Sequence, residues 1–111
     1  MTKKRMYVCS LDAAMDVIGG KWKPHILWKI KDAPLHFGAI QEKLPAISQK
    51  MLTRQLRALE KDRLVTRTEY PGMPPRVEYA LTERGQIVIP ILMSLKDWAD
   101  KELADQINES H

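Results

Sequence analysis

The segment around which this chain is organised reads Ser48-Gln-Lys-Met-Leu-Thr-Arg-Gln-Leu-Arg-Ala-Leu-Glu-Lys-Asp62. Ser48 suits the N-cap of a helix, because its hydroxyl can accept a backbone N–H that the first turn leaves unpaired. No Gly or Pro follows within the segment, and most of its residues favour helix. Leu52, Leu56 and Leu59 recur at helical spacing, so the predicted helix has one apolar seam.

The face opposite this seam is entirely basic. It carries Lys50, Arg54, Arg57 and Lys61. Like charges at helical spacing repel one another, which favours a polyanionic partner against this face. The alternative is an ordinary solvated charge stripe.

A shorter helix is predicted just before this segment, over residues 37–44, with Phe37, Ile40 and Leu44 on one face. Residues 45–47 leave room only for a tight connection, so residues 37–62 have the pattern of a helix-turn-helix. In that motif the first turns of the second helix meet base edges in the major groove. The side chains predicted there are Gln49, Lys50, Thr53 and Arg54, of which Gln suits adenine and Lys or Arg suits guanine.

Two strand-like runs follow, at residues 65–70 and 76–81, and the turn Pro71-Gly72-Met73-Pro74-Pro75 separates them. A β-hairpin directly behind a helix-turn-helix is a wing, here residues 65–81. Arg67 and Arg76 lie on this hairpin and could reach phosphates or a minor groove. The alternative is that they pair with Glu69 and Glu78 across the ribbon.

The chain begins with a basic arm, Lys3, Lys4 and Arg5, followed by Cys9. Ser10 is the expected N-cap of a helix that ends at Gly19-Gly20. A second helix is expected from about Trp22, with an edge strand at residues 35–36.

The last predicted helix covers residues 83–105, with Thr82 as its N-cap and Pro90 within it. Between Ile87 and Leu95 only Pro90 and Ser94 are not apolar, which is more apolar surface than one small core covers. A second copy of the chain is the expected partner, with residues 9–18 and 83–105 as dimerisation helices. The predicted interface residues are Leu11, Met15, Ile91, Leu95 and Trp98. The alternative is a wholly internal helix, in which Trp98 is a core residue.

The length predicts a single domain spanning residues 1–111, and the composition is ordinary for a globular protein. The net charge is +4, and residues 1–81 carry 15 Lys and Arg against 8 Asp and Glu, which suggests a polyanion partner. One cysteine, no signal sequence and no long apolar run predict a cytoplasmic protein without a membrane partner. His25, His36 and His111 lack zinc-ligand spacing, and no glycine loop suits a nucleotide, so we expect no metal, no cofactor and no enzyme.

Several uncommon strings occur in order between residues 9 and 99. They are Cys9, Asp16-Val-Ile-Gly-Gly-Lys-Trp-Lys-Pro24, His36-Phe-Gly38, Ile47-Ser-Gln-Lys-Met-Leu-Thr53, Leu56-Arg57, Leu59-Glu60, Pro74-Pro-Arg-Val-Glu-Tyr79 and Leu81-Thr82. With these strings the chain resembles the HxlR family of bacterial winged-helix transcriptional regulators.

The resemblance implies an α+β, mainly α, fold: a winged helix-turn-helix with an extra C-terminal dimerisation helix. It implies a homodimeric repressor or activator that binds double-stranded DNA, with residues 48–57 as the recognition helix. It also places Pro75 and Arg76 of the wing against DNA. One departure is Arg63, where family members often carry Gly, and a left-handed conformation there would cost about 1 kcal/mol.

Some members of this family use the cysteine at the Cys9 position to sense quinones, aldehydes or oxidants. A thiol beside a helix N-terminus and a basic arm should have its thiolate favoured, so Cys9 is a candidate redox sensor. Its reversible products would be a disulfide to the partner subunit, a mixed disulfide or an adduct. The alternative is a small buried hydrophobe under the first helix.

Two other functions remain open. A winged-helix module that binds proteins would need apolar or aromatic anchors on the recognition helix. A regulator with a non-covalent effector would need an apolar pocket at the dimer interface, which Trp22, Trp28 and Trp98 could line.

Overall fold

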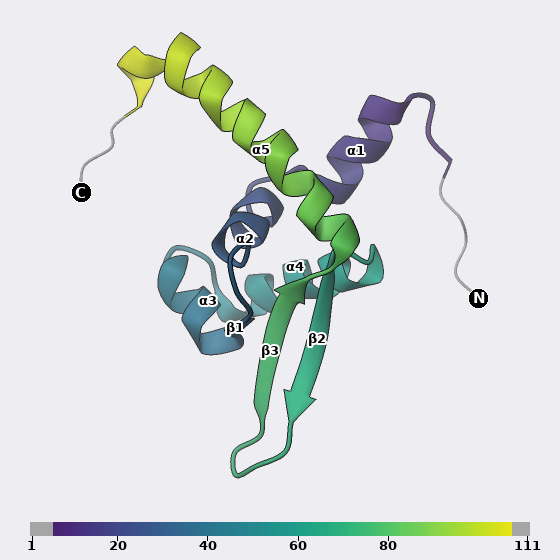
Figure 1. Ribbon diagram of the computed structural model, residues 1–111, viewed down its shortest axis with the longest axis vertical. Coiled ribbons are helices and arrows are strands. Elements are labelled where there is room, and N and C mark those ends of the chain that lie inside the picture. Colours follow the sequence, from purple (N-terminus) through teal and green to yellow (C-terminus); the bar gives the residue numbers. More distant parts are fainter. Residues whose placement is uncertain (1–5, 108–111) are drawn as a thin grey trace.

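The computed structural model describes residues 6–107, which form a mainly helical α+β winged helix (Figure 1). The elements in chain order are α1 (Ser10–Ile18), α2 (Lys23–Lys29), β1 (Leu35–His36), α3 (Phe37–Lys43), α4 (Gln49–Lys61), β2 (Val65–Tyr70), β3 (Arg76–Leu81), α5 (Glu83–Glu102) and the 3₁₀ helix η1 (Ala104–Gln106). The basic arm at Lys3, Lys4 and Arg5 lies outside the described residues, as does His111.

A three-stranded antiparallel sheet carries the wing. Its strand order is β1-β3-β2, and Val65 pairs with Leu81 at one end of the hairpin while Tyr70 pairs with Arg76 at the other. The short strand β1 pairs with β3 through Leu35 and Tyr79. The wing therefore extends from the body as a two-stranded ribbon, away from α5 (Figure 1).

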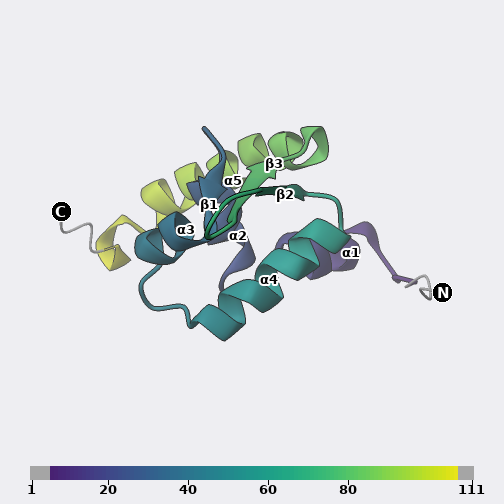
Figure 2. The same cartoon turned by 90° about the horizontal axis from the view of Figure 1, so that it is seen from below.

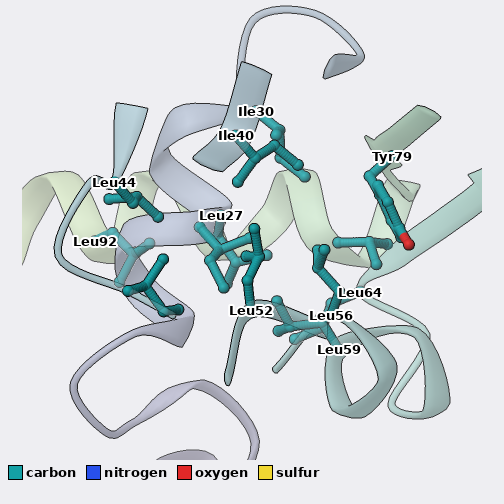
Figure 3. Packing of buried hydrophobic residues seen from close by; sticks show 13 residues of the cluster. Leu27, Ile30, Ile40, Leu44, Leu52, Leu56, Leu59, Leu64, Tyr79 and Leu92 are labelled. Atoms are coloured by element: carbon teal, nitrogen blue, oxygen red, sulfur yellow. The ribbon is translucent and has the colours of Figure 1, made fainter. Parts of the chain in front are cut away.

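The core lies where α2 packs on α3, α4 and α5 and where α4 packs on β2 (Figure 3). Leu52, Leu56 and Leu59 of the predicted seam are at most 1% exposed, and they meet Leu27 and Ile40 of the neighbouring helices. The apolar seam thus fixes the orientation of α4 and leaves its basic face outward.

Helix caps explain where three of the helices begin. Ser48 accepts the Met51 N–H at 3.0 Å and Thr82 accepts the Gly85 N–H at 2.9 Å, which confirms both predicted caps. His36 caps α3 through its Nδ1 atom, which accepts the Ala39 N–H at 3.1 Å. The prediction for Ser10 is wrong, because Ser10 is the first helical residue of α1 and Cys9 is in the N-cap position without a side-chain cap bond.

The residues after the C-terminus of α4 are hydrogen-bonded to the N-cap of α5. Arg63 has a φ of 62°, so it adopts the left-handed conformation whose cost was considered for this position. The Leu64 N–H then donates to the Leu59 carbonyl at 2.9 Å, which closes a Schellman motif. Thr82 donates its hydroxyl to the Arg63 carbonyl at 2.7 Å and its N–H to the Leu64 carbonyl at 3.0 Å. α4 and α5 therefore share one hydrogen-bonded joint.

Arg63→Gly is expected to raise the free energy of unfolding by about 1 kcal/mol, because glycine adopts the left-handed conformation without a steric penalty. Urea unfolding followed by tryptophan fluorescence, at fixed protein concentration, measures the change. Arg63→Ala is the matched control, since it removes the same charge and keeps the strained backbone. If both variants raise the free energy of unfolding equally, the charge of Arg63 and not its backbone conformation lowers the stability of the wild type.

α5 is not an internal helix, contrary to one of the alternatives. It crosses the end of the molecule opposite the wing (Figure 1), and in this chain only Gly85 and Leu92 of α5 are buried. Ile91 is 55% exposed and Trp98 is 56% exposed. The helix runs through Pro90 and ends at Glu102, earlier than the predicted residue 105, because the chain tightens into η1 after Leu103.

Candidate nucleic-acid interface

The outer face of α4 presents four cations to solvent. Lys50, Arg54, Arg57 and Lys61 are exposed, and no acidic side chain within residues 6–107 forms an ion pair with any of them. Lys50, Thr53, Arg54 and Arg57 surround a shallow depression of about 330 Å³. Because these charges are left uncompensated by the chain itself, this face attracts a polyanion.

The first turn of α4 offers both polar and apolar contacts. Gln49 is exposed, so its amide is available to an external partner. Thr53 donates its hydroxyl proton to the Gln49 carbonyl at 2.9 Å, which leaves the threonine an acceptor and a methyl group. The Ser48 hydroxyl, predicted as a DNA contact, is engaged in capping the helix.

The wing presents Arg67 and Arg76, and both form ion pairs with glutamates. Arg67 lies 3.5 Å from the Glu69 carboxylate, and Arg76 lies 3.3 Å from that of Glu78. The alternative that these arginines pair with Glu69 and Glu78 is confirmed, except that each pair lies along one strand and not across the ribbon. Exposed pairs of this kind are weak, so phosphates can compete for both guanidinium groups.

The tip of the wing is exposed throughout. Met73 is 100% exposed, and the Arg76 guanidinium lies 5.3 Å from the centre of the Tyr70 ring. Pro75 and Arg76 border a hollow of about 470 Å³ that reaches His36 at the start of α3. The side of the wing that the sequence predicted to meet DNA is therefore open.

α4 lies beside the wing, and only its C-terminal end is joined to the start of α5. Viewed from the wing end, α4 runs along one side of the β2–β3 hairpin and α5 lies on the other side (Figure 2). A concave region of about 420 Å³ between them is lined from α4 by Gln49, Thr53, Arg57 and Glu60, and from the neighbouring segments by Phe37, Arg67, Val77 and Tyr79. The structure thus brings Arg57 and Arg67 to one hollow, which helical periodicity alone did not predict.

Tyr79 is a residue of this region that the sequence reasoning missed. It is the cross-strand partner of Arg67 and lines the same hollow. Hydrogen bonding to Tyr79, more than the nearby carboxylates, holds the pKa of Arg67 above its ordinary value. The alternation of residues along the two predicted strands was the signal that could have identified it.

Cys9 lies at the start of α1, in the N-cap position, and belongs to neither α4 nor the wing. It is exposed, so the alternative of a buried hydrophobe is wrong for this chain. Its thiol donates a hydrogen bond to the Asp12 carboxylate at 3.4 Å, a contact that exists only while the sulfur carries its proton. The neighbouring Tyr7 donates to the Asp16 carboxylate at 2.6 Å, which holds the segment before Cys9 against α1.

The predicted interface residues share one property, which is exposure in this chain. They are Leu11, Met15, Ile91, Leu95 and Trp98. Helix α1 buries no residue at all. An apolar hollow of about 370 Å³ between α2 and α5 is lined in part by Trp28, Leu92 and Leu95. Neither Trp22 nor Trp98 lines this hollow, and a three-tryptophan pocket at the dimer interface stays a prediction.

Among the described residues, no three His, Cys, Asp or Glu side chains are grouped as metal ligands would be. No helix within residues 6–107 combines the length and the apolar character needed to cross a membrane.

Known proteins resemble this chain in both sequence and structure. A family model described as HxlR-like helix-turn-helix matches residues 17–107. An HTH-type transcriptional regulator of Methanothermobacter thermautotrophicus is 52% identical over 92 residues, which cover 83% of this chain and 70% of the relative. The solved structure of the redox regulator HypR in its oxidised form superposes with a TM-score of 0.80 at 41% identity, covering 85% of this chain and 97% of HypR. The reduced form of the transcriptional regulator YodB from B. subtilis gives a TM-score of 0.76 at 34% identity, covering 87% of this chain and 95% of YodB.

Proposed function

Because the chain belongs to the HxlR-like family of helix-turn-helix transcriptional regulators, we propose that it represses transcription as a homodimer bound to an inverted-repeat operator. The observation that carries this proposal is the basic outer face of α4, which has no acidic partner within residues 6–107. The protein has no catalytic role in this scheme, and DNA is its polyanionic partner. A protein-binding module fits less well, because that face lacks apolar anchors.

In the proposed complex, α4 lies in the major groove and the wing lies on the adjoining backbone. Gln49, Lys50, Thr53 and Arg54 face the bases, while Arg57, Lys61, Arg67 and Arg76 contact phosphates, with Pro75 beside them. Ser48 acts through its cap, which fixes the first turn of α4. A two-fold dimer would then place two α4 helices on half-sites about 34 Å apart, or a multiple of that distance.

A gel-shift titration against the intergenic DNA upstream of its own gene tests the proposal. Specific binding that survives excess competitor DNA is the expected result, and footprinting should reveal two symmetric half-sites. If selection from a random DNA library also yields no preferred sequence, the proposed function is wrong.

Arg54→Ala and Lys61→Ala are expected to weaken DNA binding in different ways. Loss of Arg54, at a base-reading position, should cost about 1–3 kcal/mol and relax the preference at one base pair. Loss of Lys61, one helical turn beyond Arg57, should weaken binding to every sequence and reduce the salt-dependence slope by about 1. Fluorescence anisotropy over a salt series, with operators substituted at single positions, measures both effects. The reverse pattern would mean that α4 is docked in another orientation.

We further propose that modification of Cys9 controls DNA affinity. Two findings favour this second element: the thiol is exposed beside the N-terminus of α1, and the similar protein HypR is a redox regulator. With diamide as the oxidant, two Cys9 thiols would lose two protons and two electrons to form one disulfide between protomers, and diamide would be reduced to its hydrazine. A mixed disulfide with a small thiol, or an adduct with an electrophile, would alter the same surface.

Wild-type protein treated with diamide is expected to lose operator affinity at least about tenfold and to regain it with dithiothreitol, whereas Cys9→Ser should not respond. Gel shifts measure affinity, and non-reducing electrophoresis separates a disulfide-linked dimer from a mixed disulfide. If wild type and Cys9→Ser bind alike under both conditions, the thiol switch is excluded. The α2–α5 hollow would then be the place to seek a non-covalent effector.

A further inference from the structure

The hollow between α4 and the wing has two cationic walls. Arg57 lines it from α4 and Arg67 lines it from β2, on either side of a space of about 420 Å³. Arg57 also lines the shallow depression on the outer face of α4, together with Lys50 and Arg54. The two concave regions therefore adjoin at Arg57, with the proposed base-reading residues on one side and the wing on the other.

Tyr79 is the neighbour of Arg67 on the wing. The two residues are direct cross-strand partners in the β2–β3 hairpin, and both line the hollow. The Tyr79 side chain is only 8% exposed and lies beside the Leu64 end of the core, so its oxygen is a fixed acceptor (Figure 3). A hydrogen bond from the Arg67 guanidinium to this acceptor would restrict the rotamers of the arginine and leave its other N–H donors available.

Glu60 introduces an opposing charge at the same place. It lines the hollow from α4, one helical turn after Arg57, and it acts on Arg67 through its charge. Glu69 pairs with Arg67 from the wing side at 3.5 Å. Two arginines and Glu60 therefore line the hollow, and Glu69 lies beside it. The two carboxylates reduce the attraction of the arginines for an anion, so removal of one carboxylate should increase it.

We propose that this hollow receives one phosphate of the DNA backbone, gripped between Arg57 and Arg67, with Tyr79 as the positioning residue of Arg67 and Glu60 as a charge that limits affinity. The proposal rests on the proposed DNA-binding function and specifies one contact within it. Guanidinium groups suit this role, because their planar forks match phosphate oxygens in pairs. The phosphate would lie at the edge of the major groove, next to the bases that face Lys50 and Arg54.

Tyr79→Phe tests the positioning role, since it removes one hydroxyl and keeps the buried ring. Operator affinity is expected to fall about three- to tenfold, the range for loss of one hydrogen bond that orients a charged group. Arg67→Gln should weaken binding further and reduce the salt-dependence slope by about 1, at every operator sequence. In the Arg67→Gln background, Tyr79→Phe should have no additional effect. A merely structural role of the hydroxyl would give the same loss in both backgrounds and would lower the urea midpoint.

Glu60→Gln tests the opposing charge and should move affinity in the other direction. Affinity is expected to rise about two- to fivefold at low salt and to converge on the wild-type value as salt increases. Glu102→Gln, at the far end of α5, is the matched control for the loss of one carboxylate and should leave binding unchanged.

These outcomes separate the inference from the function on which it rests. If wild-type protein binds no specific DNA, the proposed function fails. If wild type binds specifically, but Tyr79→Phe and Glu60→Gln both bind as wild type does, only the phosphate contact is overturned. Equal gains from Glu60→Gln and Glu102→Gln would also overturn it, because the effect would then come from net charge.

Discussion

Ile91→Asp is expected to convert the protein into a monomer and to weaken operator binding by about 10²- to 10³-fold. Ile91 is 55% exposed on α5, in an apolar row with Ile87, Leu95 and Trp98 at helical spacing. In a two-fold interface each substitution is made twice, so two carboxylates would be desolvated in an apolar contact. Without a partner, each α4 would bind its half-site alone and lose the gain of about 10²–10⁴ that two linked sites provide.

Sedimentation velocity measures the oligomeric state of this variant, and anisotropy measures its affinity for full and half operators. Ala33→Asp is the matched control, because it adds the same charge to an exposed position in the turn between α2 and β1. The control should remain dimeric and bind as wild type does. A dimeric Ile91→Asp protein with normal affinity would show that this face of α5 is not the interface.

Gly85→Ala is expected to lower the free energy of unfolding by about 3 kcal/mol, at the upper end of the range for overpacked sites. A Cβ atom added at Gly85 would lie 2.2 Å from the Leu64 carbonyl oxygen, which is backbone and has no rotamer to change. The first turn of α5 would have to move away from the end of α4, and the Thr82 bonds to the Arg63 and Leu64 carbonyls would weaken with it.

Urea unfolding followed by tryptophan fluorescence measures this loss, at equal protein concentrations. Gly38→Ala is the matched control, because the nearest atoms to its added Cβ belong to the His36 side chain, at 3.4 Å. Gly38 lies within α3, so alanine should stabilise the protein there, by about 0.5–1 kcal/mol. If Gly85→Ala is as stable as wild type, the close approach of α5 to Leu64 is not maintained in solution.

The helix-turn-helix and the wing were predictable because their signals are local. The leucine seam of α4, the caps at Ser48 and Thr82, and the alternation in β3 each depend on neighbours a few residues away. The same periodicity placed Lys50, Arg54, Arg57 and Lys61 on one outer face, as the structure has them. The left-handed conformation of Arg63 was raised as a condition by the family resemblance, because relatives often carry glycine there, and was not predicted from local sequence.

The features that the sequence predicted wrongly or not at all depend on contacts between distant residues, or on two adjacent residues that suit the same position equally well. Ser10 and Cys9 are adjacent, and local sequence does not determine which of the two lies just outside the helix. The neighbours of Arg67 depend on the register of β2 against β3 and on the angle between the wing and α4. The conflict at Gly85 involves a carbonyl 21 positions earlier, so no local pattern could indicate it. The exposed faces of α1 and α5 were expected from composition, but what covers them is not encoded locally.

Helix α1 has nine residues and buries none of them fully in its own chain, although its last turn packs on the core through Val17 and Ile18. An isolated helix of this length is marginal in water, so most of its stability has to come from tertiary or quaternary packing. In the proposed dimer that packing is supplied by association, and mass action then sets the fraction of α1 that is folded. The cellular concentration of the protein would therefore govern the local order around Cys9, and with it the geometry that an oxidant meets.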